Sequence, residues 1–112
     1  MKVLNYKALP ESIDTCCVKT KIKELINEAV GKSNINIKFF EMDTSGYSPL
    51  HTHRAQHRIF VTDGEGVIFN GEKTVAIRSG DVIWTGTNEP HQIKATGKEP
   101  LKFIALTLDI EK

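Results

Sequence analysis

The stretch "HRIFVTDGEGVIFNGEKTVAIRSGDVIW", residues 57–84, consists of short runs rich in Val, Ile and Phe that are separated by turn residues. Asp63-Gly64 and Asn70-Gly71 are the dipeptides that most strongly favour two-residue hairpin turns, and Ser79-Gly80-Asp81 is a third turn signal. The runs between them have the composition of β-strands. The stretch therefore predicts consecutive antiparallel strands at residues 57–62, 66–70, 73–78 and 82–86.

Further strands are predicted on both sides of this stretch. "INIKFFEM" (35–42) alternates and is rich in Ile and Phe, and a loop, "TSGYSP" (44–49), follows it. "HQIKAT" (91–96) and "LKFIALTL" (101–108) are the last two strands. Short strands at this spacing predict an all-β fold, an antiparallel sandwich or a small barrel. No linker or repeat divides the chain, so we expect one domain over residues 1–112.

The segment before residue 35 gives a conflicting local signal. "VKTKIKELINEAV" places apolar residues at helical spacing, which predicts a helix over residues 21–30. The preceding "DTCCVKTKI" is rich in β-branched residues and alternates, which favours a strand. Local pattern alone leaves both interpretations open.

Composition excludes several classes of function. The chain has 15 basic and 14 acidic residues, spread along its length, so nothing predicts nucleic-acid or membrane binding. No apolar run is long enough to span a bilayer, and the first residues lack a signal-peptide pattern, so we expect a cytoplasmic protein. Cys16 and Cys17 are adjacent and do not form the C-x-x-C spacing of a zinc or redox pair, so we expect reduced thiols.

All four histidines of the chain lie in two short patches. His51, His53 and His57 have the same parity, so on extended chain their side chains leave one face. His91 follows a turn and begins a later strand, where it can join them. Imidazole is the commonest neutral nitrogen ligand of transition metals, and burying several rings without a partner costs about 1–3 kcal/mol each. The pattern therefore predicts a metal site rather than a chance grouping.

The first histidine patch resembles the first motif of the cupin family, G-x5-H-x-H-x3,4-E-x6-G. Gly46 precedes His51 with four intervening residues, one fewer than in the family motif. His51 and His53 match the H-x-H, and His57 stands where the family has glutamate. Six residues then lead to Gly64. This substitution resembles a subgroup of small cupins whose metal is held by four histidines.

The second patch is similar to the other cupin motif, G-x5-P-x-G-x2-H-x3-N. Gly80 matches the first glycine and His91 matches the histidine. Gly86 replaces the proline, Asn88 replaces the second glycine, and Ala95 replaces the final asparagine. Asparagine is the next best residue after glycine for a left-handed turn, so Asn88 is a mild departure.

The resemblance to cupins carries further expectations. It implies a small antiparallel β-barrel, a jelly roll or double-stranded β-helix, in which residues 17–26 form a strand rather than a helix. It also implies a homodimer into which the N-terminal arm, residues 1–14, is exchanged. The ligands it implies are His51, His53, His57 and His91, holding one divalent metal per chain. We expect Fe or Mn, with Zn or Ni acquired during expression, because affinity order favours those two.

Other pocket residues follow less directly from the pattern. Ile35, Ile37, Phe39 and Glu41 share one face of their strand by alternation. If that face is the inner one, Glu41 is a candidate catalytic base and Phe39 a pocket wall; an exposed Glu41 is the alternative. Gln56, Trp84 and Phe103 are further candidates to line the pocket. A mainly apolar pocket beside a metal predicts a small, anionic or chelating ligand.

The function that these features predict is that of a metal-dependent small-molecule enzyme, of dioxygenase-like oxidoreductase type. Four neutral ligands leave the full charge on the ion, which attracts an anionic ligand, and octahedral geometry leaves two open positions. Cupins also include isomerases, decarboxylases, lyases and non-enzymatic binders, so a binding or sensing module is the alternative. A closed tetrahedral site with Zn²⁺ in a structural role is the third interpretation.

Overall fold

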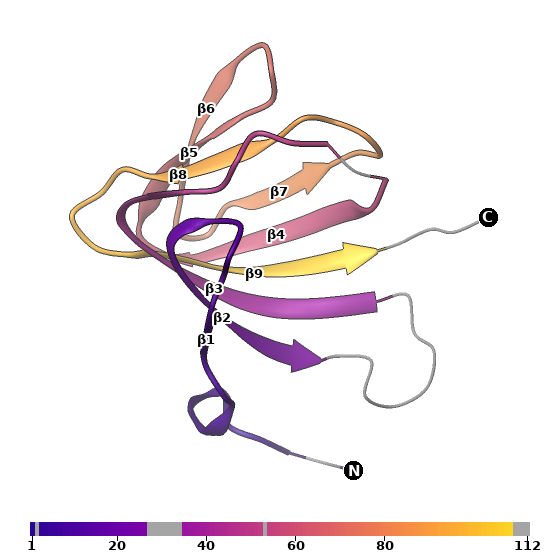
Figure 1. Cartoon of the computed structure of the whole chain (residues 1–112), viewed down its shortest axis with the longest axis vertical. Helices are drawn as coiled ribbons and strands as arrows, with labels where there is room; N and C mark the ends of the chain where they lie inside the picture. Colours follow the sequence, from indigo (N-terminus) through magenta and orange to yellow (C-terminus); the bar gives the residue numbers. More distant parts are fainter. Residues whose placement is uncertain (2, 27–34, 53, 109–112) are drawn as a thin grey trace.

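The computed structural model describes residues 1, 3–26, 35–52 and 54–108 of the chain (Figure 1). The described residues form strands throughout, apart from a short 3-10 helix, η1 (Tyr6–Ala8), and loops. The strands are β1 (Ser12–Ile13), β2 (Val18–Ile26), β3 (Ile35–Tyr47), β4 (Gln56–Asp63), β5 (Glu65–Phe69), β6 (Thr74–Arg78), β7 (Val82–Thr85), β8 (Gln92–Ala95) and β9 (Leu101–Leu108). The predicted all-β class is confirmed. No helix in the described part of the chain is long and apolar enough to cross a membrane.

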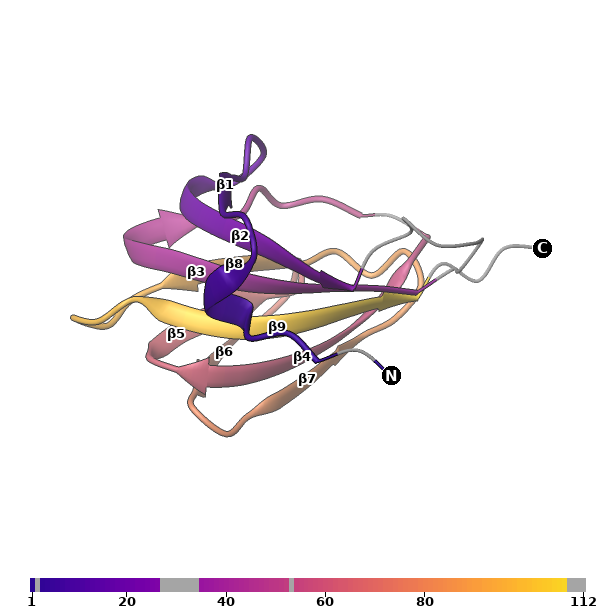
Figure 2. The same cartoon turned by 90° about the horizontal axis from the view of Figure 1, so that it is seen from below.

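The strands pair antiparallel in one strongly curled sheet. Its order is β6-β5-β8-β3-β9-β4-β7, with β2 beside β3 and β1 beside β2. Figure 1 shows β4, β9, β3 and β2 lying side by side in that order. Figure 2 shows the curl, with β2 and β3 on one side of the molecule and β4 and β7 on the other. The curl encloses an inner face, as the predicted small barrel requires.

The turns lie where the sequence predicts them, and the turn at Gly71 closes the predicted hairpin between β5 and β6. The hairpin predicted at Asp63-Gly64 is wrong, because β4 pairs with β7 and β9 whereas β5 pairs with β6 and β8. Gly64, Gly71 and Gly80 have positive φ values of 86°, 98° and 97°. Each belongs to a turn between consecutive strands, and glycine adopts this backbone region without a steric penalty. The strands from β4 to β9 begin and end within about one residue of the predicted bounds, within the scatter expected of strand ends. The turn chemistry therefore determines where these strands begin and end, but not which strands pair.

The ambiguous segment is a strand in the described residues. β2 starts at Val18 and pairs with β3, so the helix predicted from local spacing is wrong over residues 21–26. Residues 27–30 of that prediction lie outside the described residues. Pairing with β3 and β1 overrides the helical spacing, because β2 gains ladder hydrogen bonds on both sides. The strand that the family resemblance implied is thus present.

β3 runs further than predicted and joins two parts of the sheet. It continues through the expected loop to Tyr47, which pairs with Val18 on β2 and with Lys94 on β8. A Cβ at Gly46 would lie 2.7 Å from the carbonyl oxygen of Val18, so this close strand approach requires glycine. The extension turns the chain toward the first histidine patch.

The core fills the inner face of the curl. It consists of nine buried apolar residues from β3, β4, β6, β8 and β9: Met42, Ile59, Val61, Ile77, Ile93, Ala95, Leu101, Phe103 and Ala105. Burying side chains of this size stabilises the fold by about 1.5–3 kcal/mol for each large residue. Alternate residues of β9 contribute Leu101, Phe103 and Ala105, the period of two expected of a half-buried strand.

The N-terminal arm packs against its own chain in the described structure. η1 places Tyr6 against Phe39 with ring centroids 5.3 Å apart, and β1 pairs with β2. The pairing joins Ser12 to Ile22 and Ile13 to Lys21. The structure contains one chain, so the expected exchange of the arm within a dimer stays a prediction.

Candidate functional site

Three of the four predicted histidines lie together at one end of the inner face. His57 is on β4, and His51 and His91 face each other across an isolated antiparallel bridge. The ring centroids are 5.0 Å apart for His51 and His91, and 5.0 Å apart for His57 and His91. His91 stands between the other two rings and is 8% exposed. His53 lies outside the described residues.

Each of the three rings is held by a hydrogen bond on its Nδ1 side. The Nδ1 atom of His51 lies 2.8 Å from the carbonyl oxygen of Pro49, and that of His91 lies 3.0 Å from the carbonyl oxygen of Glu89. A carbonyl oxygen only accepts, so both Nδ1 atoms carry hydrogen and donate. In the neutral ring this leaves the lone pair on Nε2.

The third ring is oriented in a similar way by a side chain. The Nδ1 atom of His57 lies 3.1 Å from Oγ1 of Thr107, its neighbour in register on β9. The backbone N–H of His57 also donates to Oγ1 of the buried Thr85 at 3.2 Å. Histidines that bind metals are generally held by such a bond to the ring nitrogen that does not face the metal. The bonds at His51 and His91 leave Nε2 as the nitrogen suited to a metal, whereas the bond at His57 orients the ring and fits either tautomer, because a threonine hydroxyl both donates and accepts.

The turn from Gly86 to Pro90 positions His91. The backbone N–H of Gly86 donates to Oε1 of Glu89 at 2.9 Å, and the N–H of Glu89 donates back to the carbonyl oxygen of Gly86. Asn88 has a φ of 60°, so the asparagine at the second-glycine position adopts the left-handed turn that the sequence allows. The departure from the family motif thus preserves the turn.

The described histidines do not form a complete metal site by themselves. Across the described ranges, no group of three or more His, Cys, Asp or Glu side chains is close enough to hold a metal ion. The structure therefore shows two close ring pairs that share His91, with their donor nitrogens prepared, and the four-ligand set stays a prediction.

The histidines lie on the wall of a pocket of about 420 Å³. Its apolar lining comes from six strands: Ile13, Ile22, Phe40, Met42, Ile59, Ile93, Phe103 and Ala105. Phe40 and Phe103 stack with centroids 4.9 Å apart and an angle of 11° between their planes. Several of these residues also belong to the core, so the pocket is the open end of the core. A pocket of this size and character suits a small organic ligand.

A loop that the sequence did not single out for the site forms another wall. Asp14, Thr15, Cys16 and Cys17 line the pocket opposite the strands. Oδ1 of Asp14 accepts the N–H groups of Cys16 and Cys17 at 2.7 and 3.2 Å, so the aspartate fixes a tight turn. The pattern D-x-C-C favours such a turn. The local sequence does not show that this turn lies beside the histidines.

Both cysteines are free, in agreement with the prediction from their spacing. Burial raises the pKa of the Cys17 thiol from 9.0 to about 12, with further contributions from the charge of Asp14, its hydrogen bond and Cys16. The Cys17 thiol is therefore protonated near neutral pH. A protonated thiol is a poor nucleophile and a poor metal ligand, so its part in the pocket is that of a weakly polar wall.

Among the other candidates, Phe103 lines the pocket, whereas Phe39 and Glu41 do not. The inner face of β3 carries Phe40 and Met42, so Phe39 and Glu41 point the other way. Glu41 lies opposite Lys21 and Lys102 on the neighbouring strands. Of the two alternatives that the sequence left open for this face of β3, the outward one is therefore present, and Tyr6 of the N-terminal arm packs on it.

Gln56 and Trp84 also point away from the pocket. Gln56 is hydrogen-bonded to Thr87 and to Arg58. Trp84 is 70% exposed, and the guanidinium of Arg58 lies 4.2 Å from its ring centroid. Both residues alternate with the inward residues of their strands, His57 and Thr85, so their side chains leave the opposite face. Neither is placed to contact a ligand beside the histidines.

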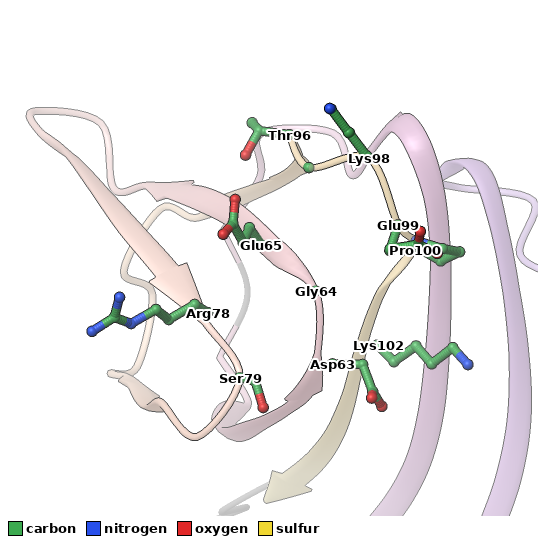
Figure 3. Close-up of a pocket in the computed structure, with 11 residues that line it drawn as sticks. Asp63, Gly64, Glu65, Arg78, Ser79, Thr96, Lys98, Glu99, Pro100 and Lys102 are labelled. Atoms are coloured by element: carbon green, nitrogen blue, oxygen red, sulfur yellow. The ribbon is translucent and has the colours of Figure 1, made fainter.

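A second, larger hollow lies near the turns and has a different character. It measures about 830 Å³ and is lined by Gly64, Gly97 and side chains of both charge signs, with no histidine. Figure 3 shows Arg78 and Lys102 extending in opposite directions from their strands. Charges that do not converge give a ligand no single point of attachment, so we place no function there.

The curled sheet with an inner, histidine-lined pocket defines a small β-barrel protein of the jelly-roll class. The chain belongs to the Cupin_2 family, whose cupin-domain model matches residues 38–108. The match covers the strands from β3 to β9 and all the described histidines.

Known relatives and structures agree with the family. The oxalate-binding protein of Thermotoga maritima is 38% identical over 60 residues, which are 53% of this chain and 50% of that protein. The match thus spans about half of that relative's length. The polyketide cyclase RemF from Streptomyces resistomycificus superimposes with a TM-score of 0.88 at 21% identity, over 98% of this chain and 80% of RemF. A predicted oxalate decarboxylase from Thermotoga maritima superimposes with a TM-score of 0.88 at 21% identity, over 97% of this chain and 100% of that protein. These structural matches establish the fold.

Proposed function

We propose that this chain is a metal-binding cupin that acts on a small, anionic and partly apolar molecule. The observation that carries the proposal is the arrangement of three imidazoles on one pocket wall, each with Nδ1 hydrogen-bonded. That arrangement orients three donor nitrogens and leaves the apolar half of the pocket for a ligand.

We propose that His51, His57 and His91, which form two close pairs but no group of three ligands in the described structure, converge on the metal together with His53, the fourth ligand that the family resemblance implies. When bound by neutral imidazoles, a divalent ion supplies Lewis-acid stabilisation to an anionic oxygen of the ligand. The chain's own residues do the rest: the histidines fix the position of that oxygen, and Phe40 and Phe103 exclude water from the ligand's apolar part. We propose Fe or Mn as the physiological metal, with Zn or Ni as replacements during expression.

A dioxygenase-like oxidation is our first proposal for the reaction, with decarboxylation, isomerisation and lyase chemistry as alternatives. Among the described residues, the lining of this pocket includes one carboxylate, Asp14, whose Oδ1 is engaged in the turn. A pocket whose one carboxylate is engaged in a turn favours chemistry in which the metal provides the activation.

A binding module is the alternative from a different class, and the name of the oxalate-binding relative supports it. A structural zinc is less well supported. A zinc ion with four protein ligands has no open position for a ligand, so it would not need a pocket of about 420 Å³ beside it.

One set of measurements tests these alternatives. Protein loaded separately with Fe²⁺, Mn²⁺ and Zn²⁺ would be mixed with small carboxylic and keto acids, including oxalate, while dioxygen uptake and carbon dioxide release are followed. Metal-dependent turnover of any acid supports the enzyme, and dioxygen uptake supports the oxidative reaction class. Saturable binding without turnover would overturn the enzyme proposal in favour of the binding module.

We also propose a homodimer in a reducing, cytoplasmic environment. Apolar side chains of the arm, Val3, Leu4 and Ile13, are 83%, 59% and 75% exposed, and a second copy would cover them. The two free cysteines suit a reducing compartment. Light scattering after size exclusion tests the dimer: a mass of one chain at all concentrations would contradict it.

A further inference from the structure

One cationic side chain lies within the histidine pocket and has no part in the proposed metal site. Lys38 is on β3 and is half-buried, and it lines the same pocket as His51, His57 and His91. It shares the inner face of β3 with Phe40 and Met42. A lysine is unusual on the inner face of an apolar barrel, because burying its charge without a partner is unfavourable.

The register of the sheet places Lys38 away from the histidines. Lys38 pairs with Ala105 on β9, and Ala105 pairs with Ile59 on β4. His57 precedes Ile59 by two residues, so its backbone is roughly 12 Å from that of Lys38 at ordinary strand spacing. Lys38 thus lies two strands from His57 and one inward-facing position further along the strands, and Phe40 and Phe103 occupy the next inward-facing position beyond Lys38.

The carboxylates near Lys38 do not account for it. Glu24 lies opposite Lys38 on β2, but its side chain is exposed to solvent. Asp14 lines the pocket, but its Oδ1 already accepts two backbone N–H groups. Neither forms an ion pair with Lys38 among the described residues. The lysine is therefore available to a ligand that enters from the open side.

The aromatic wall next to Lys38 favours a flat apolar body for the ligand. Phe40 and Phe103 are stacked nearly parallel and both face the pocket. Aromatic faces of this kind favour other aromatic groups, which pack against them in offset or edge-on arrangements. The pocket volume of about 420 Å³ lies within the range that holds drug-sized molecules, about 300–1,000 Å³. A two-carbon dicarboxylate would leave most of this space empty.

We propose that Lys38 is a specificity-determining residue that binds an anionic group on the far end of the ligand. The ligand class that fits is an aromatic or similarly flat molecule with an oxygen-donor head at the histidines and a separate carboxylate at Lys38. The inference rests on the proposed metal site for the position of the head, and it adds the body and the second charge.

Two probes of nearly equal shape test the inference. 4-Carboxybenzohydroxamate and 4-carbamoylbenzohydroxamate share a metal-binding head and an aromatic ring, and they differ by one charge at the far end. Binding of both to the full chain loaded with Ni²⁺ is measured by calorimetry. We expect the carboxylate probe to bind about tenfold more tightly, as loss of one partly buried charge-assisted contact would predict.

Three variants assign the preference to Lys38. Lys38→Met should bring the two probes to equal affinity, and Lys38→Arg should restore most of the difference. Lys94→Met, on the exposed face of β8, removes the same charge from the chain and should leave the preference unchanged. If Lys38 acts only as an ion-pair partner of Glu24, Lys38→Met will change the melting temperature, but the carboxylate probe will still bind more tightly than the amide probe. That result overturns the inference.

The same experiment separates failure of the inference from failure of the proposed function. If neither probe binds better to nickel-loaded than to metal-free protein, the metal site itself is wrong and the inference falls with it. If both bind in a metal-dependent way with equal affinity, the metal site stands and the role of Lys38 is contradicted.

Discussion

The two ends of the sheet's inner face are built from different kinds of residue. At the histidine end, His51 and His91 are fixed by backbone carbonyl groups beside a partly open apolar pocket. At the other end, Gly64 packs against the backbone of Pro100, where an added Cβ would lie 2.3 Å from its carbonyl oxygen. One end keeps space for a ligand, and the other uses close backbone packing to hold the curl. The comparison predicts that substitutions at the two ends affect different measurable properties.

The largest effect is expected at the histidine end. His91→Ala removes the ring that stands between the other two, so we expect metal affinity to fall by more than 100-fold with an unchanged far-UV circular dichroism spectrum. Gln92→Ala, the next residue along β8, is the control and should keep full metal binding. If the His91→Ala variant retained metal at full stoichiometry, the assignment of His91 as a metal ligand would be contradicted.

A large effect on stability, rather than on metal binding, is expected at the turn end. Gly64→Ala combines a φ of 86° with a clash against Pro100, so it should destabilise the fold by about 3 kcal/mol. Gly80→Ala is the matched control, because it has a φ of 97° but nothing within 4 Å of the added Cβ. The control should cost only about 1 kcal/mol. Equal losses in urea denaturation would show that backbone packing at Gly64 is unimportant.

The pocket loop can be tested by thiol reactivity. The pKa of Cys17 is about 12, so its thiol stays protonated until the pH approaches that value, whereas an ordinary thiol ionises near 9. Since the thiolate is the reactive form, iodoacetamide at pH 8 should modify Cys17 at least tenfold more slowly than the exposed Cys16. Peptide mapping after timed labelling measures both rates. Similar rates would mean that the loop does not bury Cys17 as described.

The smallest effect concerns the bond that orients His57. Thr107→Val keeps the shape of the side chain but removes the hydroxyl group, and we expect metal affinity to fall about tenfold. Thr87→Val is the control, because its hydroxyl group accepts from Gln56 outside the pocket. Competition with a chromophoric chelator measures both affinities. A loss of the same size in the control would assign the effect to general destabilisation.

The sequence predicts the parts of the fold that depend on local chemistry. The turns at Gly64, Gly71 and Gly80 follow from residues whose backbone preference is strong, and β9 has the predicted bounds, 101–108. The hairpin predicted at Asp63-Gly64 does not form, since β4 and β5 pair with other strands. β2 was not settled locally, since the spacing of its apolar residues also suits a helix. It is a strand because β3 offers a long partner, which only the family resemblance indicated in advance.

The candidate site is less accessible to sequence reasoning, for a geometric reason. Alternation shows that Phe39 and Glu41 share a face of β3, but not which face is the inner one. Tyr6, from a distant part of the chain, covers that face and leaves Phe40 to line the pocket. The loop of Asp14 and Cys17 reaches the pocket through β1 and β2, a long-range contact that no local pattern reports.

The measurement that tests the central claim most directly is elemental analysis of untagged protein grown with iron, manganese or zinc supplements. The account predicts about one transition-metal ion per chain, and its loss on dialysis against a chelator should leave the β-rich fold intact. Protein that binds no metal under any of these conditions, while still folded, would contradict the assignment of the histidine end as a metal site.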